Sequence, residues 1–318
     1  MTRPTTPLLA ASLLAVSLFT SLPALAAADP ERCSTVHFAD VGWSDITVTT
    51  AVTRYVLSEL GYITKVKRLS APDTYKAMSE GKIDVFLGNW MPSSEHDIRP
   101  YLDKGTVESL GANLTGAKYT LAVNQAAWEG GVKSFADLAK FNQQLGGKIY
   151  GIEPGNDGNA LIHKMIAGNA FGLGDFKLVE SSENGMLSQV KRAEHLEQWA
   201  VFLGWEPHPM NNQLKMHYLE GGDDWFGPNY GGATVYTNVR KGLTQECPNL
   251  GQLLKNLKFS LAMENHLMEA ILNQSTNRRR EAKAWLKANP DTLAAWLQGV
   301  TARDGGPLPS TLVQSRAP

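Results

Sequence analysis

The sequence predicts an α/β protein of two lobes that are joined by two crossings of the chain. Strand-like and helix-like segments alternate along the whole sequence, which is typical of α/β architecture with mostly parallel sheets. The length of 318 residues suggests about two domains. Two cysteines, Cys33 and Cys247, lie far apart in the sequence, and a bond between them would return the end of the chain to its first strand. A chain that leaves one lobe and returns to it must cross twice, which predicts a hinge and a cleft.

The first lobe is expected to begin with a strand at residues 35–39 that leads through Trp43 into a helix. Ser44 or Asp45 is the expected cap of this helix, and Gly61 is expected to end it. Its apolar face repeats at helical spacing and consists of Val48, Val52, Tyr55, Val56 and Leu60. The next predicted elements are a strand at 63–69, a helix at 72–79 and a strand at 83–87.

The second lobe is expected to start with a strand that Tyr119 opens. Its predicted elements are a strand at 119–123, a helix near 134–141, a strand at 148–152, a helix from about 160 to 167 and a buried strand at 199–203. A strand at 233–237 then returns to the first lobe, and residues 250–297 are expected to be helical. With crossings near 111–118 and 224–232, lobe one takes residues 29–115 and 227–318, and lobe two takes residues 116–226.

Residues 1–28 have the pattern of a secretory signal peptide. A positive charge at Arg3 precedes an apolar stretch over residues 8–22, and Ala24-Leu25-Ala26 supplies a small-x-small cleavage site. The apolar stretch is too short to span a bilayer. A retained membrane anchor is the alternative. The pattern predicts a soluble protein that is exported to the periplasm.

Cys33 and Cys247 are the two cysteines of the chain, and neither has a Cys or His neighbour at metal-site spacing. In an exported protein two such cysteines most simply form one disulfide. Two buried free thiols are the alternative. Closure of so long a loop could stabilise the fold by about 4 to 5 kcal/mol, and the bond would lie within lobe one.

Composition and motifs argue against several classes of function. With 30 Lys and Arg against 31 Asp and Glu, the formal charge is -1, so nucleic acid is an unfavourable partner. The sequence contains no Gly-x-Ser-x-Gly elbow, no His-Glu-x-x-His motif and no Gly-x4-Gly-Lys-Ser/Thr loop. Its seven histidines include no i,i+4 pair, which disfavours a metal site. Gly155 and Gly158 could hold a phosphate, but a plain turn is favoured because no Lys is near. We therefore expect neither catalysis nor a cofactor.

Aromatic residues point instead to a binding site. Trp43, Trp90 and Trp205 each follow a predicted strand beside Gly or Pro, and Tyr119 opens a strand just after the first crossing. Ligands of α/β proteins bind at strand ends that face a cleft. Ordinary core packing is the alternative for each ring alone. Together the four rings predict an aromatic cage, which suits a quaternary ammonium because ring faces attract its diffuse charge.

Two polar residues are expected at the edge of this cage. Asp45 could attract a cation and accept a hydrogen bond from a hydroxyl, although Asp at a helix start is also a common cap. Asn156, in the turn before a lobe-two helix, could supply the second polar contact. Its alternative role is that of a turn former.

Six segments, taken together and in order, resemble the periplasmic choline-binding proteins of ABC importers, which are relatives of the glycine betaine binders. They are FADVGWSD, GNWMP, GAKYTLAV, GIEPGNDGN, VFLGWEPHPMN and DWFGPNYGGATVYT. The resemblance implies a type II, Venus-flytrap binding protein whose choline cage consists of Trp43, Trp90, Tyr119 and Trp205. It also implies that Asp45 and Asn156 are the polar ligand contacts. Outside these positions, Asn124 stands where relatives often carry Pro.

The resemblance also implies the partners of the protein. These are choline, with acetylcholine as a second candidate, and an inner-membrane ABC permease, and we expect the protein to be a monomer. A glycine betaine or carnitine receptor of the same fold is one alternative, although Asp45 would repel the carboxylate of either ligand. A secreted hydrolase of choline esters or phosphocholine is another. It would need a nucleophile with its base, or a metal cluster, and neither is visible in the sequence.

Overall fold

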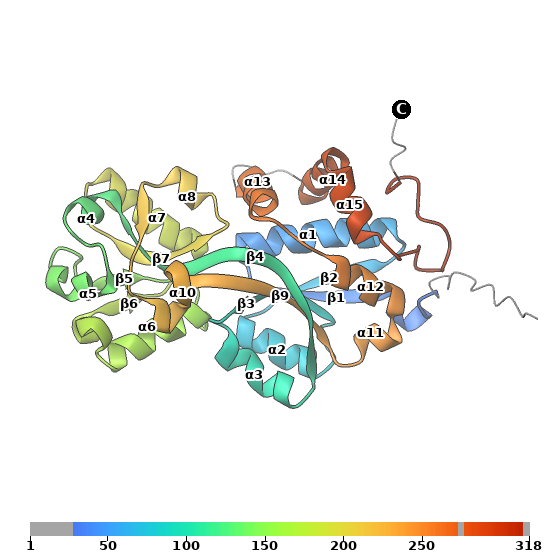
Figure 1. Ribbon diagram of the computed structural model, residues 1–318, viewed down its shortest axis with the longest axis horizontal. Coiled ribbons are helices and arrows are strands. Elements are labelled where there is room, and N and C mark those ends of the chain that lie inside the picture. Colours follow the sequence, from blue (N-terminus) through green and yellow to red (C-terminus); the bar gives the residue numbers. More distant parts are fainter. Residues whose placement is uncertain (1–27, 273–276, 314–318) are drawn as a thin grey trace, which may run out of the picture.

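The computed structural model describes residues 28–272 and 277–313 of the chain (Figure 1). The predicted signal peptide therefore lies outside the described residues, apart from Ala28.

The strands of the described part form one nine-stranded sheet in the order β2-β1-β3-β9-β4-β7-β5-β6, with β8 paired to β4. The strands are β1 (Thr35–Asp40), β2 (Ile63–Arg68), β3 (Val85–Met91), β4 (Val107–Asn124), β5 (Lys148–Tyr150), β6 (Lys177–Val179), β7 (Val201–Glu206), β8 (Met216–Tyr218) and β9 (Gly232–Arg240).

Helices flank the strands in two groups. The helices before β4 and after β9 are η1 (Glu31–Cys33), α1 (Ser44–Glu59), α2 (Ala71–Ser79), α3 (Glu95–Asp103), α11 (Leu243–Glu246), α12 (Pro248–Asn256), α13 (Leu261–Leu272), α14 (Arg278–Ala288) and α15 (Pro290–Trp296). The helices between β4 and β9 are α4 (Gln125–Glu129), α5 (Phe135–Leu138), η2 (Ala139–Phe141), α6 (Asp157–Ala167), η3 (Ala170–Asp175), α7 (Glu183–His195), α8 (Met210–Gln213), α9 (Asp223–Phe226) and α10 (Pro228–Gly231).

The sheet has two halves that share the long strand β4. The first half-sheet comprises β2, β1, β3, β9 and the start of β4, and the second comprises the end of β4 with β7, β5, β6 and β8. At the change from one half to the other, Lys118 of β4 lies opposite both Gly232 of β9 and Glu206 of β7. Figure 1 shows the first half-sheet on the right, the second on the left, and β4 and β9 between them.

The prediction of mostly parallel sheets is wrong for the centre of the sheet. Strand β1 is parallel to β2 and β3, and β5 is parallel to β6 and β7. Every pair that includes β4 or β9 is antiparallel. The reason is topological: one of these strands carries the chain out of the first half-sheet and the other carries it back, and the two pair with each other.

The first crossing, which the sequence analysis placed near residues 111–118, lies within one continuous strand, β4, although a strand was predicted to begin only at Tyr119. Glycines allow the positive φ values at Gly111 (109°) and Gly116 (78°). The register between β4 and β9 shifts between Ser109 and Ala117, as it does at β-bulges. The glycines therefore bend β4 rather than end it.

Most other predicted elements are confirmed to within a few residues, but the predicted helix cap is wrong. Helix α1 begins at Ser44, and its N-cap residue is Trp43, which makes no side-chain capping bond. The side chains of Ser44 and Asp45 have other partners. The region predicted to be helical from 250 to 297 contains most of α12 together with α13, α14 and α15.

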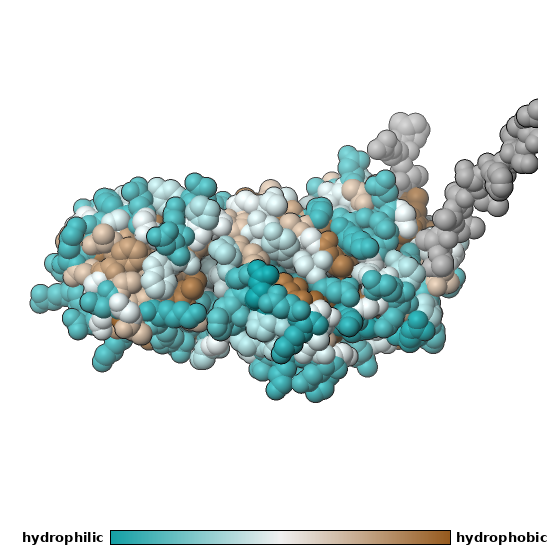
Figure 2. All heavy atoms as spheres, turned by 60° about the horizontal axis from the view of Figure 1, so that its bottom comes forward, coloured by the Kyte–Doolittle hydropathy of each residue, from teal (hydrophilic) through white to brown (hydrophobic). Residues whose placement is uncertain are grey.

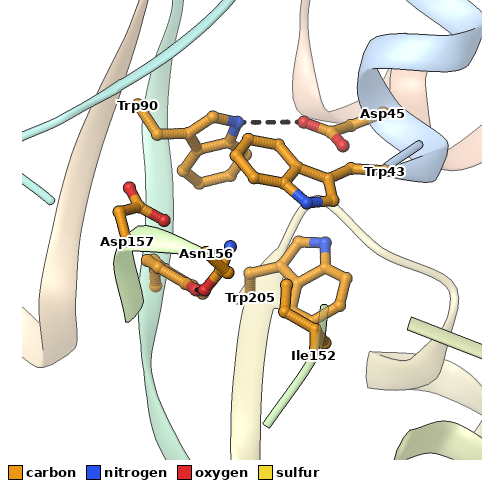
Figure 3. A pocket seen from close by; sticks show the side chains of 8 residues that line it. Trp43, Asp45, Trp90, Ile152, Asn156, Asp157 and Trp205 are labelled. Atoms are coloured by element: carbon orange, nitrogen blue, oxygen red, sulfur yellow. Dashed lines mark hydrogen bonds between the residues drawn. The ribbon is translucent and has the colours of Figure 1, made fainter. Parts of the chain in front are cut away.

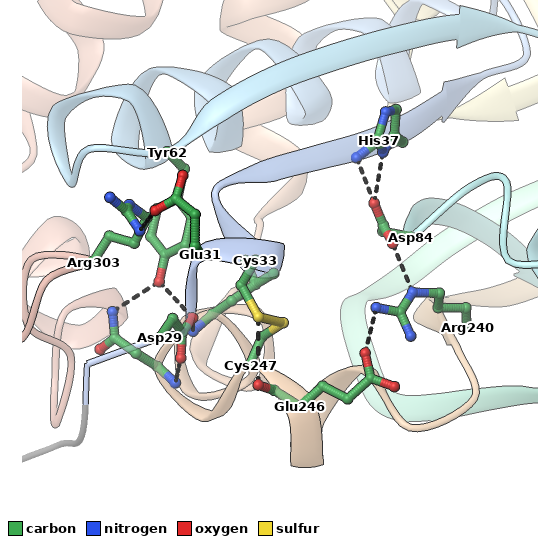
Figure 4. Close-up of a disulfide and its surroundings, with 12 residues drawn as sticks. Asp29, Glu31, Cys33, His37, Tyr62, Asp84, Arg240, Glu246, Cys247 and Arg303 are labelled. Atoms are coloured by element: carbon green, nitrogen blue, oxygen red, sulfur yellow. Dashed lines mark hydrogen bonds and ion pairs between the residues drawn. A yellow bond between two sulfur atoms is a disulfide. The ribbon is translucent and has the colours of Figure 1, made fainter.

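A disulfide joins Cys33 and Cys247 across a sequence separation of 214 residues (Figure 4). Beside it, the carboxylate of Asp29 accepts hydrogen bonds from the backbone N–H of Asn249 at 2.9 Å and of Leu250 at 3.0 Å. These N–H groups belong to the first turn of α12, whose N-cap residue Cys247 has no capping bond of its own. The N-terminal segment is therefore attached to the start of α12 in two ways: Cys33 forms the disulfide with Cys247, and Asp29 caps the helix.

On the face that Figure 2 shows, the surface is mainly polar and apolar residues gather in small patches. None of the helices within the described ranges has the length and apolar character that are needed to cross a lipid bilayer.

The disulfide is expected to contribute to stability because it closes a long loop in the unfolded chain. Replacement of both cysteines by Ser should lower the free energy of unfolding by about 2 to 5 kcal/mol, measured by urea denaturation. Dithiothreitol should have the same effect on the natural protein and none on the double variant. An unchanged unfolding midpoint in the double variant would contradict this expectation.

Candidate functional site

The turn between β1 and α1 positions the first ring, Trp43. The Asp40 carboxylate accepts hydrogen bonds from the backbone N–H of Gly42 at 2.7 Å and from Thr47 Oγ1 at 3.0 Å. Gly42 has a φ of 97°, and a Cβ at this position would lie 1.6 Å from the guanidinium of Arg68. Only glycine fits this turn without displacing Arg68. The turn delivers Trp43 to the N-cap position of α1 and Asp45 to its first turn.

The other three rings lie within strands, not after or at the start of them as the sequence predicted. Trp90 belongs to β3, Trp205 to β7, and Tyr119 to the middle of β4. Tyr119 and Trp205 lie opposite each other in the β4–β7 ladder. Strands β3 and β7 extend further than expected because their last residues pair with β9 and β4, and β4 begins earlier because its first residues pair with β9. The sequence patterns did not reveal these pairings.

The six residues that the sequence analysis selected line one small cavity (Figure 3). Trp43, Asp45 and Trp90 come from the first half-sheet and its helices, whereas Tyr119, Asn156 and Trp205 come from the second. Two further residues, Ile152 and Asp157, complete the lining. All eight side chains are buried, and no Lys or Arg is among them.

The rings meet edge to face around the cavity. The ring centroids of Trp90 and Tyr119 are 6.1 Å apart at an interplanar angle of 60°, and those of Tyr119 and Trp205 are 6.4 Å apart at 76°. Such pairs are favourable because the positive edge of one ring faces the negative face of the next. Burial, followed by the charges of Asp157 and Glu153, raises the pKa of Tyr119 well above its ordinary value, so its ring is that of a neutral phenol.

Asp45 is buried beside these rings without a cationic partner in the cavity lining. Its Oδ2 accepts a hydrogen bond from Trp90 Nε1 at 3.0 Å (Figure 3). Its Oδ1 is buried and has no hydrogen-bond partner among the described residues. Burial and the nearby charge of Glu183 raise the pKa of Asp45 to about 7. In α13, burial and the charge of Asp45 raise the pKa of Glu264 well above its ordinary value.

Asn156 has both roles that the sequence allowed for it, as a helix cap and as a residue of the cavity. It is the N-cap of α6, and its Oδ1 accepts hydrogen bonds from the backbone N–H of Asn159 at 3.1 Å and from the Tyr119 hydroxyl at 2.8 Å. A Cβ at Gly158 would lie 2.1 Å from the Tyr119 oxygen, so this contact requires glycine there. These two bonds occupy the acceptor Oδ1. The donor of the same amide, Nδ2, is buried without a partner among the described residues.

Three carboxylates of the second half accept hydrogen bonds from the first half, and the sequence analysis did not select them. The bonds join Glu153 to Trp43 Nε1 at 2.7 Å, Asp157 to Ser94 Oγ at 2.8 Å, and Glu183 to the backbone N–H of Ser44 at 2.9 Å. Glu153 and Asp157 flank Asn156 in the segment GIEPGNDGN and could have been suspected. No sequence pattern marked Glu183 or Glu264.

The arrangement is chemically suited to a small cation with an apolar periphery. Ring faces attract such a charge, and the free oxygen of Asp45 can add Coulomb attraction or accept a hydrogen bond. Nδ2 of Asn156 offers one further donor.

The chain is similar to substrate-binding proteins of ABC transporters. The family model for the substrate-binding domain of ABC-type glycine betaine transport systems matches residues 34–288. A solved ABC-transporter choline-binding protein in complex with choline is 56% identical, covers 89% of this chain and 98% of its own, and has a TM-score of 0.87. Its unliganded semi-closed form has the same identity and coverage and a TM-score of 0.82. The lactococcal OpuAC protein, closed and complexed with glycine betaine, is 27% identical over 83% of this chain and 99% of its own, with a TM-score of 0.75.

The raised pKa of Asp45 predicts a pH-dependent cost in stability. Between pH 3.8, the ordinary pKa, and about 7, the folded protein keeps a proton that the unfolded chain releases. This group therefore lowers the stability as the pH rises through that window. Asp45→Asn should remove that part of the pH dependence, so that at pH 8 the ligand-free variant is more stable than the natural protein.

Urea denaturation at pH 4 and pH 8 tests this expectation. Asp175→Asn, which changes an exposed carboxylate with no partner role in the cavity, is the matched control and should follow the natural protein. Equal destabilisation by Asp45→Asn at both pH values would contradict a buried, partly protonated Asp45.

Proposed function

Since this chain belongs to the substrate-binding proteins of ABC-type glycine betaine transport systems, we propose that it captures choline between its two halves and delivers it to an ABC permease. Members of this family bind a transported substrate and are not enzymes. The alternative of a secreted choline-ester hydrolase is therefore discarded.

The observation that carries the choline proposal is the buried Asp45 oxygen at the edge of four aromatic rings. A quaternary ammonium has no N–H to donate, so ring faces and a nearby negative charge are its natural partners. The choline hydroxyl supplies the donor that Asp45 Oδ1 lacks. The 56% identical relative was solved in complex with choline, which supports the same ligand here.

The hydrogen-bond pattern argues against glycine betaine and carnitine. A ligand carboxylate needs donors, but the indole N–H groups of Trp43 and Trp90 already donate to Glu153 and Asp45. Nδ2 of Asn156 is a buried donor that could meet the carboxylate and has no partner among the described residues. Asp45 would also repel it, and the lining offers no Lys or Arg to compensate.

We further propose that the two halves act as closing lobes, with residues 29–115 and 227–318 in one and residues 116–226 in the other. Each lobe supplies two of the four rings, so neither can surround the ammonium alone. The higher TM-score with the choline complex than with the unliganded semi-closed form supports a closed arrangement in this structure.

The cellular setting is part of the proposal. The leader-like sequence of residues 1–28 supports export to the periplasm, and family membership supports an inner-membrane permease as the partner. We propose a monomeric receptor, with acetylcholine as a second ligand that competition with choline would test.

Loss of one ring should weaken choline binding markedly. Trp43→Ala, Trp90→Ala, Tyr119→Ala and Trp205→Ala should each raise the dissociation constant by about 5- to 150-fold, or roughly 1 to 3 kcal/mol. Titration calorimetry measures this effect, with Trp285→Ala in α14 as a ring-removal control outside the cavity. Natural affinity in two of the four cavity variants would refute the cage.

Choline affinity should fall as the pH falls below about 7, because the cation favours the ionised form of Asp45, whose pKa without ligand is about 7. The affinity for choline should fall by at most about tenfold for each pH unit below 7. Asp45→Asn should abolish this dependence and weaken choline more than glycine betaine, since it also removes the repulsion of the betaine carboxylate. Calorimetry at pH 6, 7 and 8 with both ligands provides the test. Equal losses for the two ligands would show that Asp45 does not act through its charge.

A further inference from the structure

Helix α1 receives its N-terminal cap from the opposite half of the molecule. The first backbone N–H groups of a helix need acceptors, and the N-cap residue Trp43 makes no capping bond. Glu183 of α7 fills this role: its Oε2 accepts from the backbone N–H of Ser44 at 2.9 Å, and its Oε1 accepts from Ser44 Oγ. The positive end of the α1 dipole favours this carboxylate.

Glu183 is itself held firmly. It is the first residue of α7, where Ser182 is the N-cap and accepts a hydrogen bond from the backbone N–H of Gly185 at 3.1 Å. The Glu183 residue is 5% exposed. Burial raises the pKa of its carboxyl, but hydrogen bonds from His208 and Ser44 outweigh this effect and leave the pKa below its ordinary value. Glu183 is therefore a carboxylate at neutral pH.

The Glu183 carboxylate also contacts His208, which packs against the ring of Trp205. Nδ1 of His208 accepts a hydrogen bond from the backbone N–H of Met210 at 2.9 Å, so the proton lies on Nε2. Nε2 donates to Glu183 Oε1 over 3.3 Å. The imidazole packs edge to face on Trp205, with ring centroids 4.9 Å apart. Glu183 thus links the position of Trp205 to the Trp43–Ser44–Asp45 segment.

We infer that Glu183 is a positioning residue that holds the closed cage together by capping α1 across the cleft, and that it thereby sets how long the ligand stays bound. This inference rests on the proposed closing of the two lobes. Glu183 does not line the cavity. Its contacts reach the ligand through Ser44 and His208, and its charge acts through the carboxyl of Asp45.

The inference predicts a specific kinetic effect. The bond between Glu183 and His208 lies within the second half, but the bonds to Ser44 cross between halves and are lost when the cleft opens. Their loss should therefore speed dissociation and leave association nearly unchanged. Charged hydrogen bonds of this kind predict a rise of about 10- to 100-fold in the dissociation rate constant.

The test uses the full mature protein and the variants Glu183→Gln, Ser44→Ala and the double variant. Ser44→Ala removes the cross-cleft hydroxyl contact without changing any charge near Asp45. Glu197→Gln, which removes an exposed carboxylate from the same half, is the matched control. Stopped-flow Trp fluorescence gives the rate constants for choline and for glycine betaine, and urea denaturation of the ligand-free proteins gives stability.

The expected result is faster dissociation in both single variants, with the double variant no faster than Glu183→Gln, because the two residues share one interaction. Ser44→Ala should leave ligand-free stability unchanged, since its bond forms only in the closed state. Glu197→Gln should match the natural protein in both assays.

Natural dissociation rates in Glu183→Gln and Ser44→Ala would overturn the inference, as would rate effects that simply multiply in the double variant. Failure of the choline proposal would appear differently, as tighter binding of glycine betaine by the natural protein. In that case the role of Glu183 is tested by the ratio of the dissociation rate constants of glycine betaine from the variant and from the natural protein.

Discussion

The burial of the Asp45 carboxylate among aromatic rings is the constraint around which the cavity is organised. One oxygen is held by Trp90, and the other is buried without a partner among the described residues. The raised pKa of about 7 reflects the cost of that burial. A cation in the cavity would relieve this cost. The feature that destabilises the ligand-free protein is therefore the one that favours a positively charged ligand over a zwitterion with a carboxylate.

Two helices whose N-cap residues make no capping bond are capped by carboxylates that are distant in the sequence. Trp43 and Cys247 occupy N-cap positions without making capping bonds, and Glu183 and Asp29 supply the acceptors. The Asp29 contact lies beside the disulfide and stays within the first half. The Glu183 contact crosses between the two halves and lies beside the cavity. Both contacts supply the acceptors that the first turn of a helix needs. The Asp29 contact is permanent, whereas the Glu183 contact, by our proposal, breaks when the two halves open.

The sequence could predict the rings, Asp45, Asn156 and the cysteine pair, because local signals mark each of them. It could not predict Glu183 or Glu264, since neither belongs to a motif and each gains its role from a contact far along the chain. The same limit explains the strand errors. The strand that includes Tyr119 was expected to begin at that residue, but pairing with β9 extends β4 back through Gly111 and Gly116, where the register shifts as at bulges. Trp43 is at the N-cap because Asp40 and Gly42 fix the turn, which overrides the capping preference of Ser44.

The central claim is that the charge of the ligand, and not its shape alone, is recognised by the four rings and Asp45. The most direct measurement is a calorimetric comparison of choline with 3,3-dimethylbutan-1-ol, its uncharged analogue of nearly the same shape and with the same hydroxyl. Removal of the charge eliminates the attraction of the rings and of Asp45, so the account predicts binding at least about 100-fold weaker. Affinities within about threefold of each other would contradict it, because the cavity would then be recognising an apolar shape.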